Sequence, residues 1–272
     1  IRDRFTPAAE QENSFAAFAL GKLYLAGDAV LPKDPMAALK WLTYAAELGN
    51  QFAQYRLGKL LLKGDDGIPK DVITAIRWLT AAAKQENGYA EYALALVYLT
   101  GEDAPKDSVK ALSLLKRSAG RGNQFAQYRL GKLLLQGEDA PKDVKAAIRW
   151  LTAAAEQGNQ YAQYALGKLY LLGKEVPKDR SSAIKWFQLA ADQGNEYAQY
   201  FLKHMDDRLG QPPVAAVISL FHHLANIFQE QNQPPPSGGV RVAVDRKLLR
   251  KIKAKKIAQG HKADDHEPEM QL

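Results

Sequence analysis

The sequence predicts an all-α solenoid of about six helix-turn-helix pairs, built on a period of 36 residues. Each period contains two amphipathic segments, and a pair of this size cannot bury its apolar side alone, so neighbouring copies must stack. The tripeptide Pro-Lys-Asp marks the period at Pro32, Pro69, Pro105, Pro141 and Pro177, with spacings of 37, 36, 36 and 36 residues. Tryptophans keep the same spacing at Trp41, Trp78, Trp150 and Trp186, with Leu114 at the missing position.

Composition excludes several classes of protein. The 272 residues are 46% hydrophobic, which is enough to form a continuous core. The absence of cysteine excludes disulfides and thiolate metal sites and is compatible with a reducing compartment. No run approaches the roughly 18 apolar residues that a membrane span needs, and no secretory signal precedes the repeats. We therefore expect a cytoplasmic protein without a membrane partner.

Each helix boundary has a local cause. The first helix of one pair is expected from about Asn50 to Lys63, and Gly64 ends it. Asp71 is placed to cap the second helix, because its carboxylate can accept from free amides of the first turn. Gly49 closes the preceding helix in a left-handed conformation, and Asn50 caps the next helix.

Five segments follow from these boundaries. Residues 1–12 form a lead-in, residues 13–209 form the repeats, and residues 210–232 form an altered helix that covers the exposed end of the stack. Residues 233–244, rich in proline and glycine, read as a linker, and residues 245–272 form a basic, partly helical or disordered tail. Between Val240 and Lys262 nine Lys or Arg stand against one Asp, so much of the +7 net charge lies in this tail.

The residues themselves carry a family resemblance. The segment from Ala53 to Leu60, a glycine-containing loop that ends in Pro69-Lys70-Asp71, and the later Trp78 resemble the Sel-one-like repeat, a relative of the tetratricopeptide repeat. This resemblance implies a right-handed superhelix that serves as an adaptor for protein partners. One copy departs from the pattern, with Glu86-Asn87-Gly88 for Gly-Asn-Gln and Ala95 for glycine, which affects local packing.

The tail has a second resemblance. Residues 245–267 are similar to the C-terminal end of relaxase-type proteins encoded on mobile elements. That resemblance implies an alternative function, in which the chain is an accessory region of a DNA-processing relaxase and the nicking chemistry lies upstream of Ile1.

A surface on the first helices is the strongest candidate site. If these helices line the concave side, as the tetratricopeptide resemblance implies, residues three and four apart face outward together. We call the following set the aromatic-lysine row: Phe52, Tyr55, Lys59, Tyr89, Tyr92, Phe125, Tyr128, Lys132, Tyr161, Tyr164, Lys168, Tyr197 and Tyr200. The row would suit an extended peptide with apolar and acidic residues. The competing interpretation is that the rings pack between adjacent repeats.

The basic tail is a candidate contact for nucleic acid, because lysine and arginine can neutralise phosphates. Its candidate residues are Arg246, Lys247, Arg250, Lys251, Lys253, Lys255 and Lys256. The competing interpretation is a solvated terminus.

No pattern predicts a catalytic residue, a cofactor, a metal site or a small-molecule substrate. The adjacent His222 and His223 lack the spacing of a helical metal pair, and Gly-Lys pairs such as Gly58-Lys59 lie inside helices, unlike phosphate loops. We expect the recurring loop carboxylates to be solvated; they are Asp65, Asp66, Glu102, Asp103, Glu138 and Asp139. The sequence thus predicts a non-enzymatic interaction scaffold that binds a protein or peptide, with nucleic acid as a further partner through the tail.

Overall fold

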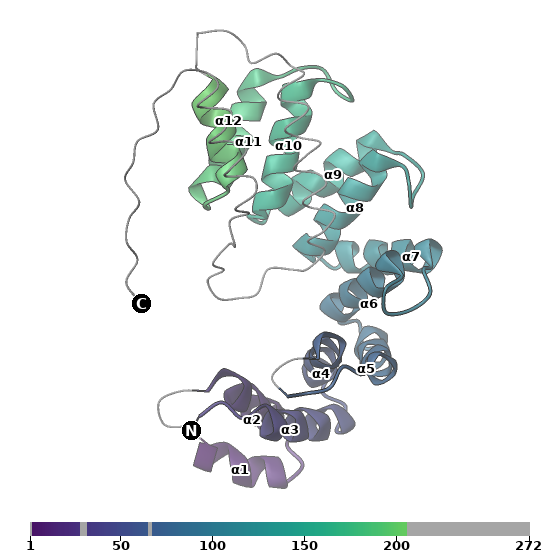
Figure 1. Ribbon diagram of the computed structural model, residues 1–272, viewed down its shortest axis with the longest axis vertical. Helices are drawn as coiled ribbons and strands as arrows, with labels where there is room; N and C mark the ends of the chain where they lie inside the picture. The colour runs from purple at the N-terminus through teal and green to yellow at the C-terminus, as the bar shows by residue number, and fades with distance from the viewer. Residues whose placement is uncertain (1, 28–31, 65–66, 206–272) are drawn as a thin grey trace, which may run out of the picture. The chain divides into compact units, whose positions relative to one another are not determined.

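The computed structural model describes residues 2–27, 32–64 and 67–205, and within these ranges all regular structure is helical. The helices are α1 (Arg2–Glu10), α2 (Ser14–Ala26), α3 (Pro35–Glu47), α4 (Gln51–Lys63), α5 (Val72–Lys84), α6 (Gly88–Thr100), α7 (Ser108–Gly120), α8 (Gln124–Gln136), α9 (Val144–Glu156), α10 (Gln160–Leu172), α11 (Arg180–Asp192) and α12 (Glu196–Met205). The helices from α2 to α11 form five antiparallel pairs, which confirms the all-α solenoid (Figure 1). α12 occupies the next first-helix position, and the partner expected for it at 210–232 lies outside the described residues.

The helix caps are those that the sequence predicts. The side chain of Asn50 accepts hydrogen bonds from the amides of Phe52 and Ala53, both at 3.0 Å. Asp71 accepts from the amide of Thr74 at 3.0 Å at the start of α5. Gly49 has a φ of 84°, the left-handed conformation that lets the chain turn into α4. These local bonds fix where each helix begins and ends.

Close helix crossings hold each pair together. A Cβ atom added at Gly58 of α4 would lie 2.6 Å from Cγ of Leu79 on α5, so only glycine allows this approach without a shift. Gly131 meets Leu151 in the same way, at 2.7 Å. The third pair carries Ala95 at this position, where Leu115 of α7 remains fully buried. Glycine therefore allows the close approach at Gly58 and Gly131 but is not required in every pair.

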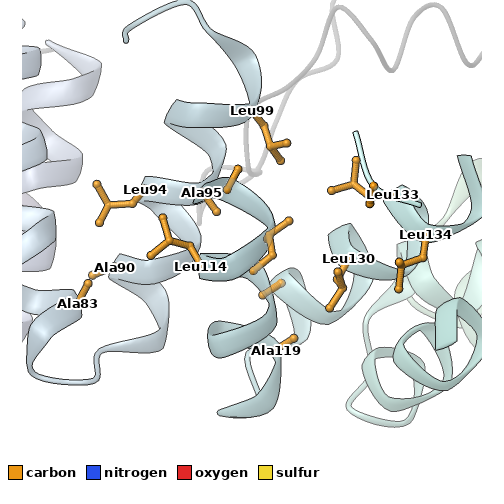
Figure 2. Packing of buried hydrophobic residues seen from close by; sticks show 14 of the residues in the cluster. Ala83, Ala90, Leu94, Ala95, Leu99, Leu114, Ala119, Leu130, Leu133 and Leu134 are labelled. Atoms are coloured by element: carbon orange, nitrogen blue, oxygen red, sulfur yellow. The ribbon is translucent and has the colours of Figure 1, made fainter. Parts of the chain in front are cut away.

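The core is continuous from one pair to the next. Buried alanine and leucine side chains from α5, α6, α7, α8 and α9 form one cluster, of which Figure 2 shows the central part. Leu94 on α6 and Leu114 on α7 belong to this cluster together with Leu130 on α8. Leu114 stands where other repeats carry a half-buried tryptophan, and it is 8% exposed. Because each pair shares its apolar side with its neighbours, no pair forms a core alone.

Glutamine pairs join neighbouring repeats at the helix ends. The Nε2 atom of Gln85 donates to Oε1 of Gln54 at 2.9 Å. Gln54 itself is buried and donates to the carbonyl of Ala46 at 3.1 Å. Equivalent pairs occur between Gln157 and Gln127 and between Gln193 and Gln163.

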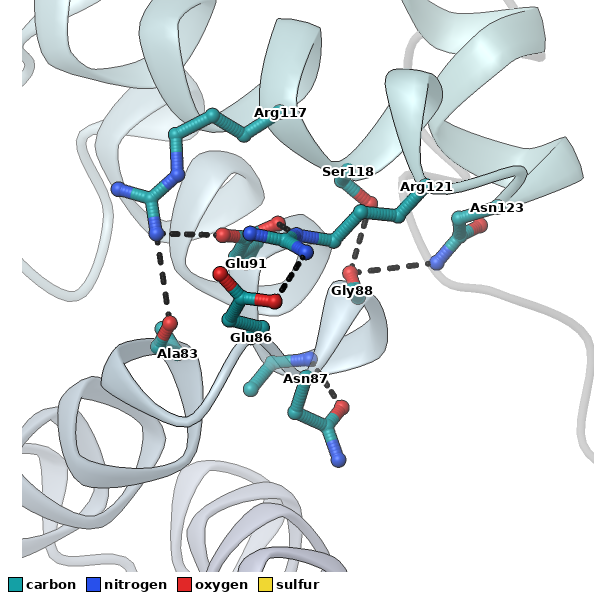
Figure 3. Close-up of polar contacts among 10 residues, drawn as sticks. Ala83, Glu86, Asn87, Gly88, Glu91, Arg117, Ser118, Arg121 and Asn123 are labelled. Carbon is teal, nitrogen blue, oxygen red and sulfur yellow. Dashed lines mark hydrogen bonds and ion pairs between the residues drawn. The ribbon is translucent and has the colours of Figure 1, made fainter.

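In the repeat that departs from the sequence pattern, charged side chains replace this amide pair (Figure 3). Glu91 stands at the position of Gln54 and is fully buried, while Arg121 stands at the position of Gln85. Arg117 reaches Oε1 of Glu91 at 2.5 Å, and Nε of Arg121 lies 3.4 Å from Oε2. Arg117 also donates to the carbonyl of Ala83 at 3.3 Å, which is the role that the glutamine amide fills elsewhere. The departure is therefore a coordinated set of substitutions at one junction.

Glu86 completes this junction in an unusual backbone conformation. Its φ is 66°, where the other repeats carry glycine, and a non-glycine residue there is strained. Its carboxylate binds the guanidinium of Arg121 at 2.9 Å, and this contact holds the pKa of the Glu86 carboxyl below its usual value. We define Glu86, Glu91, Arg117 and Arg121 as the charged junction.

The expectation that the loop carboxylates are merely solvated is wrong for two of them. Asp103 forms an ion pair with Lys70 at 2.5 Å, and Asp139 forms one with Lys106 at 2.8 Å. Each lysine belongs to the Pro-Lys-Asp sequence of the preceding repeat, because stacking brings the successive loops into contact. The Ser108 hydroxyl also donates to Asp139 at 2.7 Å. The loops therefore contribute to the contact between repeats.

The lead-in at residues 1–12 contains a helix, α1, which packs against α2. Ala9 at its end is fully buried and joins the cluster that contains Ala17 and Leu20. The sequence shows no repeat motif here, so repeat matching does not reveal this helix. The linker and tail expected at 233–272 lie outside the described residues.

Candidate partner-binding surface

The aromatic rings of the first helices meet in pairs across each junction between repeats. Tyr55 on α4 lies against Tyr89 on α6, with ring centroids 5.9 Å apart. The pairs that continue this arrangement are Phe18–Phe52 at 6.3 Å, Tyr92–Phe125 at 6.3 Å, Tyr128–Tyr161 at 6.0 Å and Tyr164–Tyr197 at 6.0 Å. The interpretation that the rings pack between repeats is confirmed for these contacts.

The same rings keep solvent-facing area. Phe52 and Tyr89 are 48% and 54% exposed, and Tyr200 on α12 is 45% exposed. The remaining aromatic members of the row are half-buried. Each junction thus offers part of an aromatic surface in addition to an internal contact, so packing and binding are compatible roles.

Burial controls the chemistry of the tyrosines. It raises the pKa of Tyr128 to about 12, and it raises the pKa of Tyr92 as well, with an opposing effect from Arg129 on both. The pKa of Tyr164 is also raised by burial. These phenols therefore stay neutral well above neutral pH and keep their O–H donors.

Three lysines of the row are half-buried. Burial lowers the pKa of Lys59, and Arg56 and Lys63 lower it further. Burial likewise lowers the pKa of Lys132, with a contribution from Arg129, and that of Lys168, with contributions from Lys132 and Lys174. Burial and neighbouring cations both disfavour the charged form of these ammonium groups, and Glu138 opposes this effect at Lys132.

The row lacks acidic side chains over most of its length. Helices α2, α4, α8 and α10 contain no aspartate or glutamate. The acidic residue of α6, Glu91, is fully buried against Arg117 and Arg121. In this repeat the aromatic pairs continue but the lysine is missing, because Leu96 stands where α4 and α8 carry lysine.

Sequence reasoning missed several residues of this surface. Phe18 of α2 contacts Phe52, and the ammonium of Lys22 lies 5.7 Å from the Phe18 ring centroid. Phe18 and Lys22 lie one period before Tyr55 and Lys59, so the repeat spacing could have identified them. Arg129 was also missed, and its Nε atom is buried without a hydrogen-bond partner in the described part of the chain.

The structure adds no evidence for the other candidate sites. The candidate nucleic-acid contacts, Arg246 to Lys256, and the pair His222 and His223 lie outside the described residues. Within residues 2–27, 32–64 and 67–205, no three His, Asp or Glu side chains form a group that could hold a metal ion. No helix in these ranges has both the length and the apolar character needed to cross a membrane.

Comparisons with known proteins agree on the architecture. A Sel1 repeat protein from Oxalobacter formigenes is 34% identical, with a TM-score of 0.67, and the match covers 74% of this chain and 58% of that one. A protective antigen of uropathogenic Escherichia coli with an SLR fold is 30% identical, with a TM-score of 0.69, and the match covers 88% and 53% of the two chains. The chain therefore spans between half and two thirds of the length of these relatives.

A search of curated proteins gives no match. The matches also give no support to the resemblance of residues 245–267 to relaxase-type proteins. Sel1 repeats usually mediate protein interactions, and their fold is typically non-catalytic. The Sel1 repeat model matches residues 14–50, 51–87, 88–123, 124–159 and 160–195 in succession. The chain belongs to the Sel1 repeat family.

Proposed function

We propose that the chain is a non-enzymatic interaction scaffold and that a segment of a partner protein lies across the aromatic-lysine row. The observation that carries this proposal is the continuity of the row, in which inter-repeat ring pairs link the first helices from α2 to α12. Large, rigid aromatic side chains provide much of the binding energy at protein interfaces. A surface that repeats once per helix pair suits an elongated segment better than a compact ligand.

The charges of the surface support the same function. Half-buried lysines alternate with the aromatic pairs on α4, α8 and α10, and these helices carry no acidic residue. A partner segment with apolar side chains would cover the rings, and its acidic side chains would lie favourably beside Lys59 and Lys132. The tyrosine hydroxyls add donors for its backbone carbonyls.

Site-specific photocrosslinking tests the location of the site. A photoreactive phenylalanine analogue replaces Tyr89, which is 54% exposed on α6, and a matched control carries it at Ile73, which is 84% exposed on α5. We expect position 89 to form covalent adducts with a defined protein segment and position 73 to form few.

The crosslinked segment is then synthesised, and its affinity for the purified chain is measured by titration calorimetry. Phe52→Ser and Tyr89→Ser should each weaken binding by about tenfold, which corresponds to roughly 1.4 kcal/mol. Ile73→Ser should leave the affinity unchanged. Equal crosslinking at positions 73 and 89, or equal affinities for all variants, would refute the assignment of the partner to the row.

A further inference from the structure

Arg129 lies on α8 beside two ring pairs of the aromatic-lysine row. The Tyr92–Phe125 pair joins α6 to the start of α8, with ring centroids 6.3 Å apart. The Tyr128–Tyr161 pair joins α8 to α10, with centroids 6.0 Å apart. Burial raises the pKa of Tyr92 and of Tyr128, and the charge of Arg129 opposes this effect at both hydroxyls. The guanidinium therefore lies near phenol groups that come from two different repeats.

The Arg129 guanidinium has no dedicated acceptor in the described part of the chain. Its Nε atom is buried and forms no hydrogen bond there, while the side chain as a whole is half-buried and keeps some solvent-facing area. Hydrogen bonds from Lys106 and Ser108 hold the pKa of the Asp139 carboxyl below its usual value, and the charge of Arg129 adds to this effect. Asp139 is thus already bound by two other side chains. A donor left without an acceptor is costly, so an acceptor group brought by a ligand would be stabilised here.

A second cation lies on the same side of α8. Lys132 follows Arg129 by three residues, which makes the two side chains neighbours on the helix surface, with Cβ atoms about 5–6 Å apart. Burial lowers the pKa of Lys132, the charge of Arg129 lowers it further, and the exposed loop residue Glu138 opposes both effects. Two adjacent cations therefore share little compensating negative charge.

This arrangement depends on the neighbouring repeat as well as on the sequence of α8. Helices α4 and α8 begin with the same twelve residues, and Arg56 of α4 is the counterpart of Arg129. Arg56 is exposed, however, and the position of Tyr92 is taken there by Phe18, which contacts the start of α4 but has no hydroxyl group. α10 carries Ala165 in place of the arginine. The half-buried arginine with tyrosines from two repeats is thus a feature of the α6–α8 junction.

One ligand group can satisfy both cations if it carries nearly two negative charges. A carboxylate carries one, whereas a phosphate monoester carries about −1.5 to −2 at neutral pH and has three strong acceptor oxygens. The planar guanidinium can bind two such oxygens in parallel, and the ammonium binds as a point charge. Neutral phenol hydroxyls are further donors. A phosphate monoester therefore matches the charge and the donors of this surface better than a carboxylate does.

We propose that Arg129 and Lys132, together with the hydroxyls of Tyr92 and Tyr128, bind a phosphorylated side chain of the partner segment. This inference deepens the proposed function and rests on it. The guanidinium and the ammonium hold the phosphate, and an apolar residue next to the phosphorylated one lies against the Tyr128–Tyr161 ring pair. We call this set of four residues the phosphate site.

Single-stranded nucleic acid is the other phosphate-bearing chain that a basic aromatic surface can bind. Its bases bind by stacking on aromatic rings, and each of its phosphodiesters carries a single negative charge. The rings beside the phosphate site already pack against one another across the repeats, so their faces are partly covered. The observations favour a phosphorylated protein segment, and nucleic acid becomes an outcome of the test.

The test uses the full chain and synthetic fluorescent peptides of about eight residues. The probe carries one phosphoserine between leucines, and the comparison peptides carry serine or glutamate at that position. Anisotropy titrations at about 0.1 M salt should show the phosphoserine peptide binding at least tenfold more tightly than the serine peptide and at least threefold more tightly than the glutamate peptide. Inorganic phosphate should displace the probe only with a much weaker affinity than that of the phosphoserine peptide, because it lacks the apolar flanks.

Variants locate the contact. Arg129→Lys keeps the charge but loses the planar donors, so it should weaken binding of the phosphoserine peptide by roughly threefold to tenfold, and Arg129→Gln should weaken it further. Lys132→Gln should also weaken it by at least threefold. Arg56→Gln is the matched control, because it makes the same change in the identical sequence of α4, and it should have no effect. The affinity for the serine peptide should be the same in all variants, and circular dichroism verifies that the helices are intact.

Four results would overturn the inference. They are failure of the phosphoserine peptide to bind more tightly than the serine peptide, equal losses from Arg56→Gln and Arg129→Gln, an affinity for inorganic phosphate equal to that for the peptide, and displacement of the peptide by a thymidine oligonucleotide that binds more tightly.

Photocrosslinking at position 89 separates this inference from the proposed function. Mass spectrometry of the crosslinked segment should find a phosphorylated residue. Adducts with a segment that carries no phosphate would refute the phosphate site and leave the proposed function intact. Loss of the adducts would instead refute the proposed function.

Discussion

The charged junction allows one interaction between repeats to be tested quantitatively. Glu91 is fully buried, and its charge is balanced by Arg117 and Arg121, whose side chains are 51% and 34% exposed. At these two positions the following repeat carries alanine and glutamine. The double variant Arg117→Ala/Arg121→Gln therefore introduces side chains that the fold already accepts, but it leaves a buried carboxylate without its partners.

The free energy of unfolding should fall sharply in this double variant. Leaving one charge of a buried pair uncompensated typically costs roughly 3–5 kcal/mol. Adding Glu91→Gln to the double variant restores the side chains of the other repeats, and the new amide can donate to the carbonyl of Ala83 as Gln54 does to Ala46. We expect the triple variant to lie within about 1 kcal/mol of the wild type.

Urea unfolding followed by circular dichroism gives the comparison, with thermal unfolding as a second measure. For a chain of this size about 1 kcal/mol corresponds to roughly 2–4 °C, so the double variant should melt on the order of 10 °C below the triple variant. Repeat arrays can unfold in parts, so hydrogen exchange of the α5–α7 amides provides a local measure. If the double variant were as stable as the triple variant, the reasoning about the buried carboxylate would be wrong.

Three further predictions concern other contacts. Gly131→Ala places a Cβ atom 2.7 Å from Cγ of Leu151. The free energy of unfolding should fall by about 1–2 kcal/mol, after allowing for the higher helix propensity of alanine. A variant that is more stable in urea unfolding would contradict this. Burial raises the pKa of Tyr128 to about 12, so this phenol ionises at lower pH in the unfolded chain than in the folded one. The free energy of unfolding should therefore be unaffected by this group below about pH 10 and should decline as the pH rises toward 12. This decline, measured by denaturation at each pH, should shrink in Tyr128→Phe. Lys106→Ala removes the ion pair with Asp139, in which both groups are partly exposed. The melting temperature should fall slightly at low salt and hardly at all at high salt, because salt screens such a pair. A loss that does not depend on salt would indicate a packing effect instead.

Much of the fold could be predicted from local signals. The caps at Asn50 and Asp71 bind amides two or three residues away, so the sequence around each boundary contains the whole interaction. The left-handed glycine at position 49 is equally local. The period of 36 residues follows from repetition of these signals, and the stacking follows because one pair cannot bury its own apolar side.

The candidate site could be predicted in part. Helical spacing places Tyr55 and Lys59 on one side of α4, and this much is readable from the sequence. The contact between Tyr55 and Tyr89 cannot be read from the sequence, because it joins residues from different repeats and depends on how closely the two helices approach. The assignment of the row to a partner stays a prediction.

By itself, the sequence determined the family, the helix boundaries and the composition of the row, because each depends on interactions within a few residues or on exact repetition. Only the tertiary structure decided which side chains from different repeats meet. Gln85 binds Gln54 across 31 residues, and Lys70 binds Asp103 across a comparable interval. Glu91 meets its charged partners only because the neighbouring repeat packs against it. The equivalent position in another repeat holds a neutral glutamine amide. Such contacts depend on the geometry of stacking, which no single repeat contains.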